Sequence, residues 1–151
     1  MNADAIAETL GGKGVAELRR DGLWLDMPAA KVDEMARVMR DAEARFVTMT
    51  AKLMDDNAHV QLMYHWDIDG ELLTIKVVVK DSAKSIIELW PAADWVERET
   101  RDYFDLAFEG REETPPLMLR AGDQRGLFKR TAPVGRGADP AYTAKTGEEA
   151  R

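Results

Sequence analysis

The chain has 151 residues, of which 45% are apolar and 32% charged, with a net charge of −7 and no cysteine. This composition is typical of one soluble globular domain. The negative charge argues against a nucleic-acid-binding protein, which would carry a basic surface stripe. The lack of cysteine excludes disulfides, a thiolate nucleophile and cysteine-ligated zinc or iron–sulfur sites.

The distribution of apolar residues bears on location. No uncharged apolar run approaches ~18 residues, the length at which a transmembrane helix is considered. The first residues include Asp4 and Glu8 and lack the pattern of a secretory signal. We therefore expect a cytoplasmic protein that reaches a membrane only through its partners.

The first third of the chain alternates between helical and strand-like patterns. Residues 2–10 have the periodicity of a short amphipathic helix. Val15–Met27 predicts a β-hairpin around Asp21-Gly22, a dipeptide favoured in type I′ turns. Pro28 opens a helix to about Ala44, in which apolar positions form one core-facing stripe. That stripe consists of Val32, Met35, Ala36 and Met39.

Three strand-like runs follow, at Phe46–Leu53, Ala58–Ile68 and Leu72–Lys80. In the first, Val47 is expected on the same buried face as Met49, because side chains alternate along a strand. The second and third are joined by a hairpin turn at Asp69-Gly70. This order of elements, closed by a final helix, predicts an α+β fold. We expect a two-layer sandwich of a mostly antiparallel sheet with helices on one face.

The final predicted helix covers Trp90–Gly110. Pro91 suits a first helical turn, and Gly110 is a helix stop. Wound at about 100° per residue, its apolar residues fall within one arc that would face the core. The arc holds Ala92, Trp95, Val96, Tyr103 and Leu106. Phe104 falls on the opposite side, among charged residues, where we expect it to contact a partner.

Glu99 falls in the middle of this apolar arc, with Arg98 and Asp102 on its border. A carboxylate there is costly to bury unless a cation or a hydrogen-bond donor pairs with it. Three interpretations stay open: a partner inside the same domain, a partner on another subunit, or a catalytic acid or base. Glu97 lies about 160° from Glu99 around the helix, so the two are not expected to share acid–base work.

From residue 111 onward the apolar periodicity ends, and prolines and glycines punctuate the sequence. We therefore predict a folded domain at residues 1–110 and an extended or disordered C-terminal tail at residues 111–151. Between Arg120 and Arg136 the tail is basic, with Asp123 as its only acid. It is interpreted either as a solvated tail or as a strap that orders along an acidic groove of a partner.

Other patterns that could carry chemistry are weak. His59 and His65 lie about 20 Å apart along an extended strand, so they cannot hold one metal ion and are expected as exposed strand residues. No glycine-rich loop follows a strand to bind a nucleotide. No serine or threonine lies in a nucleophile-elbow pattern, so a catalytic triad has no starting point.

A resemblance to a known family rests on one stretch, which reads Trp95-x-Glu97-Arg98-Glu99-x-x-Asp102-Tyr103-Phe104-x-Leu106-x-Phe108-x-Gly110. It resembles the signature of the C subunit of NADH-quinone oxidoreductase, the 30-kilodalton family of respiratory complex I. This family has relatives in the energy-converting, membrane-bound NiFe hydrogenases. Asp105 stands where the family usually has glycine, and Arg111 where it usually has histidine. These departures, with the short chain, favour a hydrogenase-type or other divergent complex.

The resemblance implies a non-catalytic structural subunit of the peripheral arm of a membrane-bound redox complex, without a cofactor of its own. The implied partners are the large subunit related to NiFe hydrogenase large subunits and the iron–sulfur small subunit, at the inner face of the cell membrane. The predicted subunit interface consists of Trp95, Glu97, Arg98, Glu99, Asp102, Tyr103, Phe104, Phe108 and Gly110.

Three alternatives stay open. One is the C subunit of an NADH-quinone oxidoreductase, and another is an assembly factor that uses the same fold. The third, from a different class, is a free-standing small enzyme with Glu99 as general acid or base. A pocket lined by Trp95 and Tyr103 would support the enzyme.

Overall fold

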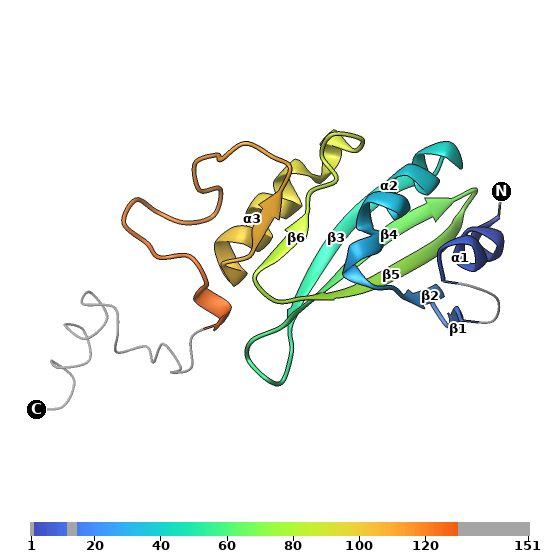
Figure 1. Cartoon of the computed structure of the whole chain (residues 1–151), viewed down its shortest axis with the longest axis horizontal. Coiled ribbons are helices and arrows are strands. Elements are labelled where there is room, and N and C mark those ends of the chain that lie inside the picture. Colours follow the sequence, from blue (N-terminus) through green and yellow to red (C-terminus); the bar gives the residue numbers. More distant parts are fainter. Residues whose placement is uncertain (1, 12–14, 130–151) are drawn as a thin grey trace, which may run out of the picture.

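The computed structural model describes residues 2–11 and 15–129. A five-stranded sheet, in the order β1-β2-β5-β4-β3, forms one layer, and the helices at residues 3–11 and 32–41 form the other (Figure 1). The strands of the sheet are β1 (Glu17–Arg19), β2 (Gly22–Asp26), β3 (Arg45–Leu53), β4 (Val60–Ile68) and β5 (Glu71–Val79). The helix at residues 94–104 lies beside the edge strand β3. Only the β2–β5 pair is parallel, and the other pairs of this sheet are antiparallel. The predicted α+β class with a mostly antiparallel sheet is confirmed.

The remaining elements are shorter. The helices are α1 (Ala3–Gly11), α2 (Val32–Asp41) and α3 (Asp94–Phe104), with single 3-10 turns at η1 (Ala29–Lys31), η2 (Pro91–Ala93) and η3 (Leu127–Lys129). A separate two-stranded parallel sheet joins β6 (Ser82–Lys84) to β7 (Ala107–Glu109). Across the described ranges, no helix has the length and apolar character that a bilayer crossing requires.

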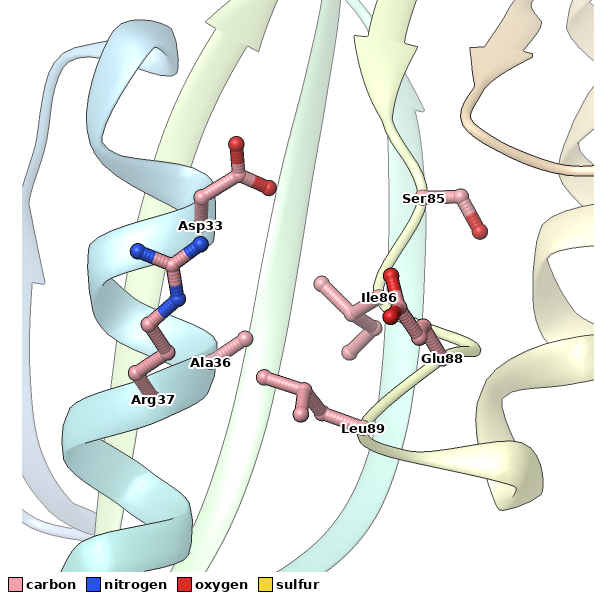
Figure 2. A pocket seen from close by; sticks show the side chains of 7 residues that line it. All are labelled: Asp33, Ala36, Arg37, Ser85, Ile86, Glu88 and Leu89. Carbon is pink, nitrogen blue, oxygen red and sulfur yellow. The ribbon is translucent and has the colours of Figure 1, made fainter.

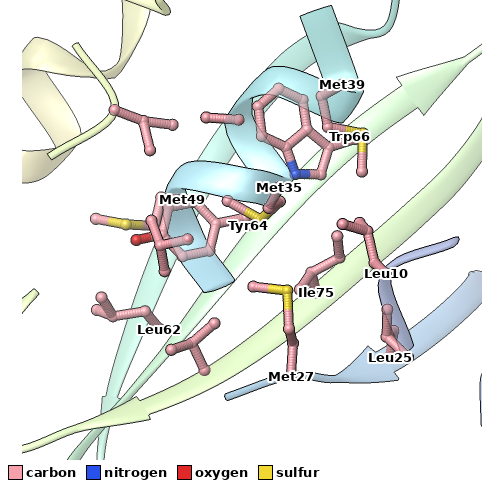
Figure 3. Packing of buried hydrophobic residues seen from close by; sticks show 14 of the residues in the cluster. Leu10, Leu25, Met27, Met35, Met39, Met49, Leu62, Tyr64, Trp66 and Ile75 are labelled. Atoms are coloured by element: carbon pink, nitrogen blue, oxygen red, sulfur yellow. The ribbon is translucent and has the colours of Figure 1, made fainter. Parts of the chain in front are cut away.

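The core lies between the sheet and the helices (Figure 3). The predicted stripe on α2 is confirmed, since Met35 and Met39 are fully buried. They pack in one cluster with Tyr64 and Trp66 of β4 and with Leu10 of α1. Burying a side chain of this size stabilises the fold by about 1.5–3 kcal/mol.

Both predicted hairpins form. Asp69 and Gly70 have φ angles of 52° and 89°, as a type I′ turn requires, and they join β4 to β5. The first hairpin pairs Arg19 with Gly22, so its turn residues are Arg20 and Asp21, one position earlier than predicted.

The register of β3 departs from the predicted alternation at Val47. Phe46 pairs with Trp66, but the next paired residue is Thr48, opposite His65. Val47 lies between them as the extra, unpaired residue of a β-bulge. Val47 is therefore 42% exposed, and Phe46 packs edge-on against Trp66 in the core. The prediction that Val47 shares the buried face of Met49 is wrong, since one extra residue shifts every side chain before it to the other face.

Helix α3 is shorter than the predicted Trp90–Gly110 helix. Pro91 opens η2, α3 begins at Asp94 and ends at Phe104, and Asp105 caps it with φ 48° and ψ 46°. This left-handed conformation is the usual helix C-cap and favours glycine, which the family resemblance places at this position. Gly110 instead follows β7, with φ 87°. The prediction that Gly110 ends the helix is wrong, because the helix ends at Phe104 and β7 lies between it and Gly110.

We expect Asp105→Gly to stabilise the chain, because it removes the left-handed strain of a residue with a side chain. The expected gain in the free energy of unfolding is about 0.5–1 kcal/mol, measured by urea denaturation of the full chain. Ala107→Gly in β7 is the matched control and should lose a similar amount, since strand glycine adds unfolded-state entropy. A loss at residue 105 as well would contradict the strain argument.

Candidate functional site

The buried face of α3 is not the one that the apolar arc predicts. Trp95 is 69% exposed, while Glu97 and Asp102 are fully buried and Arg101 is 5% exposed. Phe104, predicted to be exposed, is 6% exposed and packs edge-on against Phe128. Helix α3 therefore buries Glu97, Arg101 and Asp102 and exposes Trp95. The arc residues Val96, Tyr103 and Leu106 still pack against the core or lie within it, as predicted.

Glu97 is held by three donors inside the chain. Its carboxylate accepts hydrogen bonds from the Ser85 hydroxyl at 2.7 Å, the Ile86 backbone N–H at 2.8 Å and the Arg111 guanidinium at 3.0 Å. The same guanidinium also binds Asp94. Burial raises the pKa of Glu97, and the three donors oppose that rise without cancelling it. The carboxylate is thus a satisfied structural group.

The small parallel sheet explains why these donors meet. Lys84 of β6 pairs with Glu109 of β7, and the Ser85 N–H donates to the Glu109 carbonyl at 2.8 Å. Ser85 and Arg111 therefore leave the same end of this sheet, next to the first turns of α3. Sequence reasoning missed both residues as partners of Glu97. The available signal was that Asp94 and Glu97 share one helix face, three residues apart, where two carboxylates require a cation.

A shallow hollow of about 130 Å³ lies on the other side of Ser85, between α2 and residues 85–89 (Figure 2). Asp33, Arg37 and Glu88 stand around it. The Ser85 side chain points away from this hollow, toward α3, as its bond to Glu97 requires. The volume of this hollow is below the ~300–1,000 Å³ that is typical of small-molecule sites, so we assign no ligand to the hollow.

Asp102 binds the segment that follows β7. One of its oxygens accepts the backbone N–H groups of Leu117 and Met118 at 2.7 and 2.9 Å, and the other accepts Arg101 at 3.1 Å. Burial alone would raise the pKa of Asp102, but the two N–H groups and Arg101 outweigh it and hold that pKa below its usual range.

Arg101 binds the same stretch from the other side, through the carbonyls of Thr114 and Pro115 at 2.9 and 3.0 Å. Residues 111–126 contain no helix or strand, as predicted for the tail. Their first part is nevertheless tied to α3 by these buried groups. The boundary at residue 110 stays a prediction, and residues 130–151 lie outside the described residues.

The outward side of α3 carries a groove against the edge strand β3. Glu99 and Tyr103 line it from α3, Thr50 from β3 and Phe128 from η3. Trp95 is not among its lining residues. This groove is therefore not the pocket of Trp95 and Tyr103 that would support the enzyme hypothesis.

The predicted interface residues divide into two groups. Trp95, Glu99 and Tyr103 reach the outward side of α3, and Gly110 is exposed after β7. The buried or internally bonded ones are Glu97, Arg98, Asp102, Phe104 and Phe108. Whether a partner covers the outward group stays a prediction.

The histidines have local partners. His65 is half-buried between the Thr50 and Thr74 hydroxyls, at 3.0 and 2.9 Å, and His59 binds Asp56 just before β4. Burial lowers the pKa of His65. In the part of the chain that the structure describes, no three His, Asp or Glu side chains gather as metal ligands would.

Comparison with known proteins gives a consistent result. The family model described as "Respiratory-chain NADH dehydrogenase, 30 Kd subunit" matches residues 25–130. The C subunit of NADH-quinone oxidoreductase from Rhodopseudomonas palustris (strain TIE-1) is 29% identical over 145 residues, covering 87% of this chain and 71% of that one. The C/D subunit of NADH-quinone oxidoreductase from Bacteroides thetaiotaomicron is 28% identical over 110 residues, which are 62% of this chain and 21% of that one.

A solved structure shares the fold. It is a chain of the membrane-bound sulfane sulfur reductase, described as an archaeal respiratory membrane complex. The TM-score is 0.70 at 23% identity, and the alignment covers 95% of this chain and 88% of that one. The resemblance that the Trp95–Gly110 stretch indicates is confirmed by the family match.

Proposed function

The chain belongs to the family of the 30 kDa subunit of respiratory-chain NADH dehydrogenase, and from that premise we propose that it is a non-catalytic structural subunit of a membrane-bound redox complex. It would lie in the peripheral arm, on the inner face of the cell membrane. There it would dock on the large subunit related to NiFe hydrogenase large subunits, beside the iron–sulfur small subunit. Electrons would pass through those neighbours.

One observation carries this proposal. Helix α3 is fixed from within by the ion pairs of Arg111 with Asp94 and Glu97. It presents Trp95 outward, with 69% of that residue exposed. A large aromatic side chain on a rigid helix is the kind of residue that anchors protein interfaces, because it buries much area at little cost in conformational entropy. The internal ion pairs thus serve to position the outward face.

The relative from Bacteroides thetaiotaomicron, the C/D subunit, supports the choice of partner. This chain matches about a fifth of its length, since the alignment covers 21% of it. In that relative a domain of this family is thus covalently joined to a further polypeptide. Joining two chains raises their effective concentration for each other, and it suits domains that function side by side.

The structure also bears on the type of complex. Asp105 takes the left-handed conformation that glycine would adopt, and Arg111 forms ion pairs with both Asp94 and Glu97. Arg111 thus has a local structural reason, whereas Asp105 occupies a conformation that favours glycine, so neither departure requires a hydrogenase-type parent. The curated relatives named above are NADH-quinone oxidoreductase subunits, which favours that type.

Purification from membranes tests the proposal. A tagged full-length chain should co-purify in stoichiometric amounts with a large subunit and an iron–sulfur subunit. Activity of that complex with NADH and quinone, or with protons, then identifies its type. Isolation of the chain alone, active on a substrate of its own, would contradict the proposal.

We expect Trp95→Ala to weaken association with the large subunit roughly tenfold while leaving the isolated chain's free energy of unfolding within about 0.5 kcal/mol. The reason is that Trp95 contributes little to the chain's own core. Titration of the purified partner and urea denaturation measure the two effects. Leu18→Ala in β1, 78% exposed at the opposite edge of the sheet, is the matched control and should change neither.

A further inference from the structure

The groove between α3 and β3 has a volume of about 300 Å³. Its polar and aromatic lining consists of Thr50, Glu99, Thr100, Tyr103, Phe104 and Phe128. The volume is at the lower end of the range for ligand sites, so the groove suits one long side chain better than a cofactor.

The charge of the groove comes from Glu99. Neither arginine of α3 is available to it, because Arg98 binds Asp94 and the Pro115 carbonyl, and Arg101 binds Asp102. Over residues 2–11 and 15–129, no hydrogen bond or ion pair reaches the Glu99 carboxylate. The groove therefore has one negative charge without a counterion inside the described fold.

Two aromatic rings form a wall of the same groove. Tyr103 and Phe128 stack with ring centroids 4.7 Å apart and an interplanar angle of 24°, and Phe128 is 53% exposed. The face of an aromatic ring attracts cations, and a planar guanidinium can stack on it while bonding to a carboxylate. An open aromatic wall next to a lone carboxylate is thus complementary to an arginine side chain.

We propose that this groove receives an arginine side chain from the large-subunit partner, with its guanidinium on Glu99 and against the rings of Tyr103 and Phe128. The inference rests on the proposed function and specifies the chemistry of its interface. Arginine fits better than lysine because its planar group can bond a carboxylate and stack at the same time. Glu99 would then act as the charged specificity contact beside the Trp95 anchor.

The first experiment locates the groove relative to the partner. The chain has no cysteine, so Thr50→Cys places a single thiol beside the groove, on the exposed edge of β3, and Glu8→Cys places one on the exposed side of α1. We expect maleimide to label both thiols in the isolated full chain. In the complex with the large subunit, it should label residue 50 at least tenfold more slowly and residue 8 at an unchanged rate.

The second experiment tests the charge. Glu99→Gln should weaken binding of the large subunit at least tenfold, and Glu99→Asp should weaken it less. The salt dependence of binding should also decrease in Glu99→Gln, because an ion pair is lost. Glu8→Gln, the matched control, should bind as the unmodified chain does. Thermal unfolding of each isolated variant confirms that the fold is retained.

Each contrary result has a distinct meaning. If the thiol at residue 50 is protected but Glu99→Gln binds normally, the docking surface stands and the arginine inference falls. If that thiol reacts equally in the complex, the groove is outside the interface, and Trp95→Ala then decides the proposed function separately. If it is protected in the isolated full chain, residues 130–151 or a second copy fill the groove. Light scattering distinguishes these two, and either overturns the inference.

Discussion

Replacing Glu97 by alanine is expected to lower the free energy of unfolding of the full chain by about 3–5 kcal/mol, the range for breaking a buried ion pair. The Arg111 side chain is 6% exposed, so without Glu97 its charge would stay buried with only Asp94 to balance it. The Ile86 N–H would also lose its acceptor. Urea denaturation followed by tryptophan fluorescence measures the change.

Two further variants separate charge from packing. In the double variant Glu97→Gln with Arg111→Met, the amide oxygen still accepts from Ile86 and no charge is left buried. Its cost should therefore fall to about 1–2 kcal/mol. Asp94→Asn should cost at most about 1 kcal/mol, because Asp94 is 34% exposed and water screens its pair. If the double variant is as unstable as Glu97→Ala, the buried charge is not the cause.

Prediction from the sequence succeeded wherever apolar residues alone defined a face. The α2 stripe of Val32, Met35 and Met39 has no charged member, so helical periodicity identified its buried side correctly. The β4–β5 hairpin was equally clear, because Asp69-Gly70 fits one turn type between two alternating strands. These elements determine most of the sheet and its helical cover.

Prediction failed where burial depends on partners distant in sequence. On α3, Glu97 is buried because Ile86 and Arg111 reach it, 11 and 14 residues away along the chain. The periodicity of the helix does not indicate those contacts, so the sequence predicted that the charged face of α3 would be exposed. The Val47 bulge and the parallel β6–β7 pair were not predicted for a similar reason, because both depend on the register between strands.

The groove shows the same division. Glu99 and Tyr103 were predicted as interface residues from the signature stretch, and both lie on the outward side of α3. Phe128 could not be placed with them from the sequence, because it belongs to a segment without periodicity. The segment that leads to Phe128 is held against α3 by the contacts of Asp102 and Arg101 with residues 114–118. After Glu97, Asp102 is therefore the second residue on which this side of α3 depends.

We expect Asp102→Ala to lower the free energy of unfolding by about 3 kcal/mol, because it leaves the buried Arg101 without its carboxylate and two backbone donors without their acceptor. Leu117 and Met118 lose the oxygen that both share, so residues 114–118 should detach from α3 before the rest unfolds. Hydrogen exchange at these two amides should accelerate more than at Val60 or Leu62 in β4. Equal acceleration everywhere would mean that Asp102 supports the whole core.

The pH dependence of stability follows from the same contacts. The pKa of Asp102 is lower in the folded chain than its unfolded value of about 3.9, so its stabilising contribution is complete above that value. The contribution is lost as the pH falls through the folded pKa, because protonation removes the acceptor that Leu117, Met118 and Arg101 require. The difference in free energy of unfolding between the native chain and Asp102→Asn should thus be constant near neutrality and shrink below pH ~4. Leu18→Ala, which changes an exposed residue without a titrating group, is the control and should show no such trend. A difference that persists unchanged at low pH would show that Asp102 acts through its shape and not through its charge.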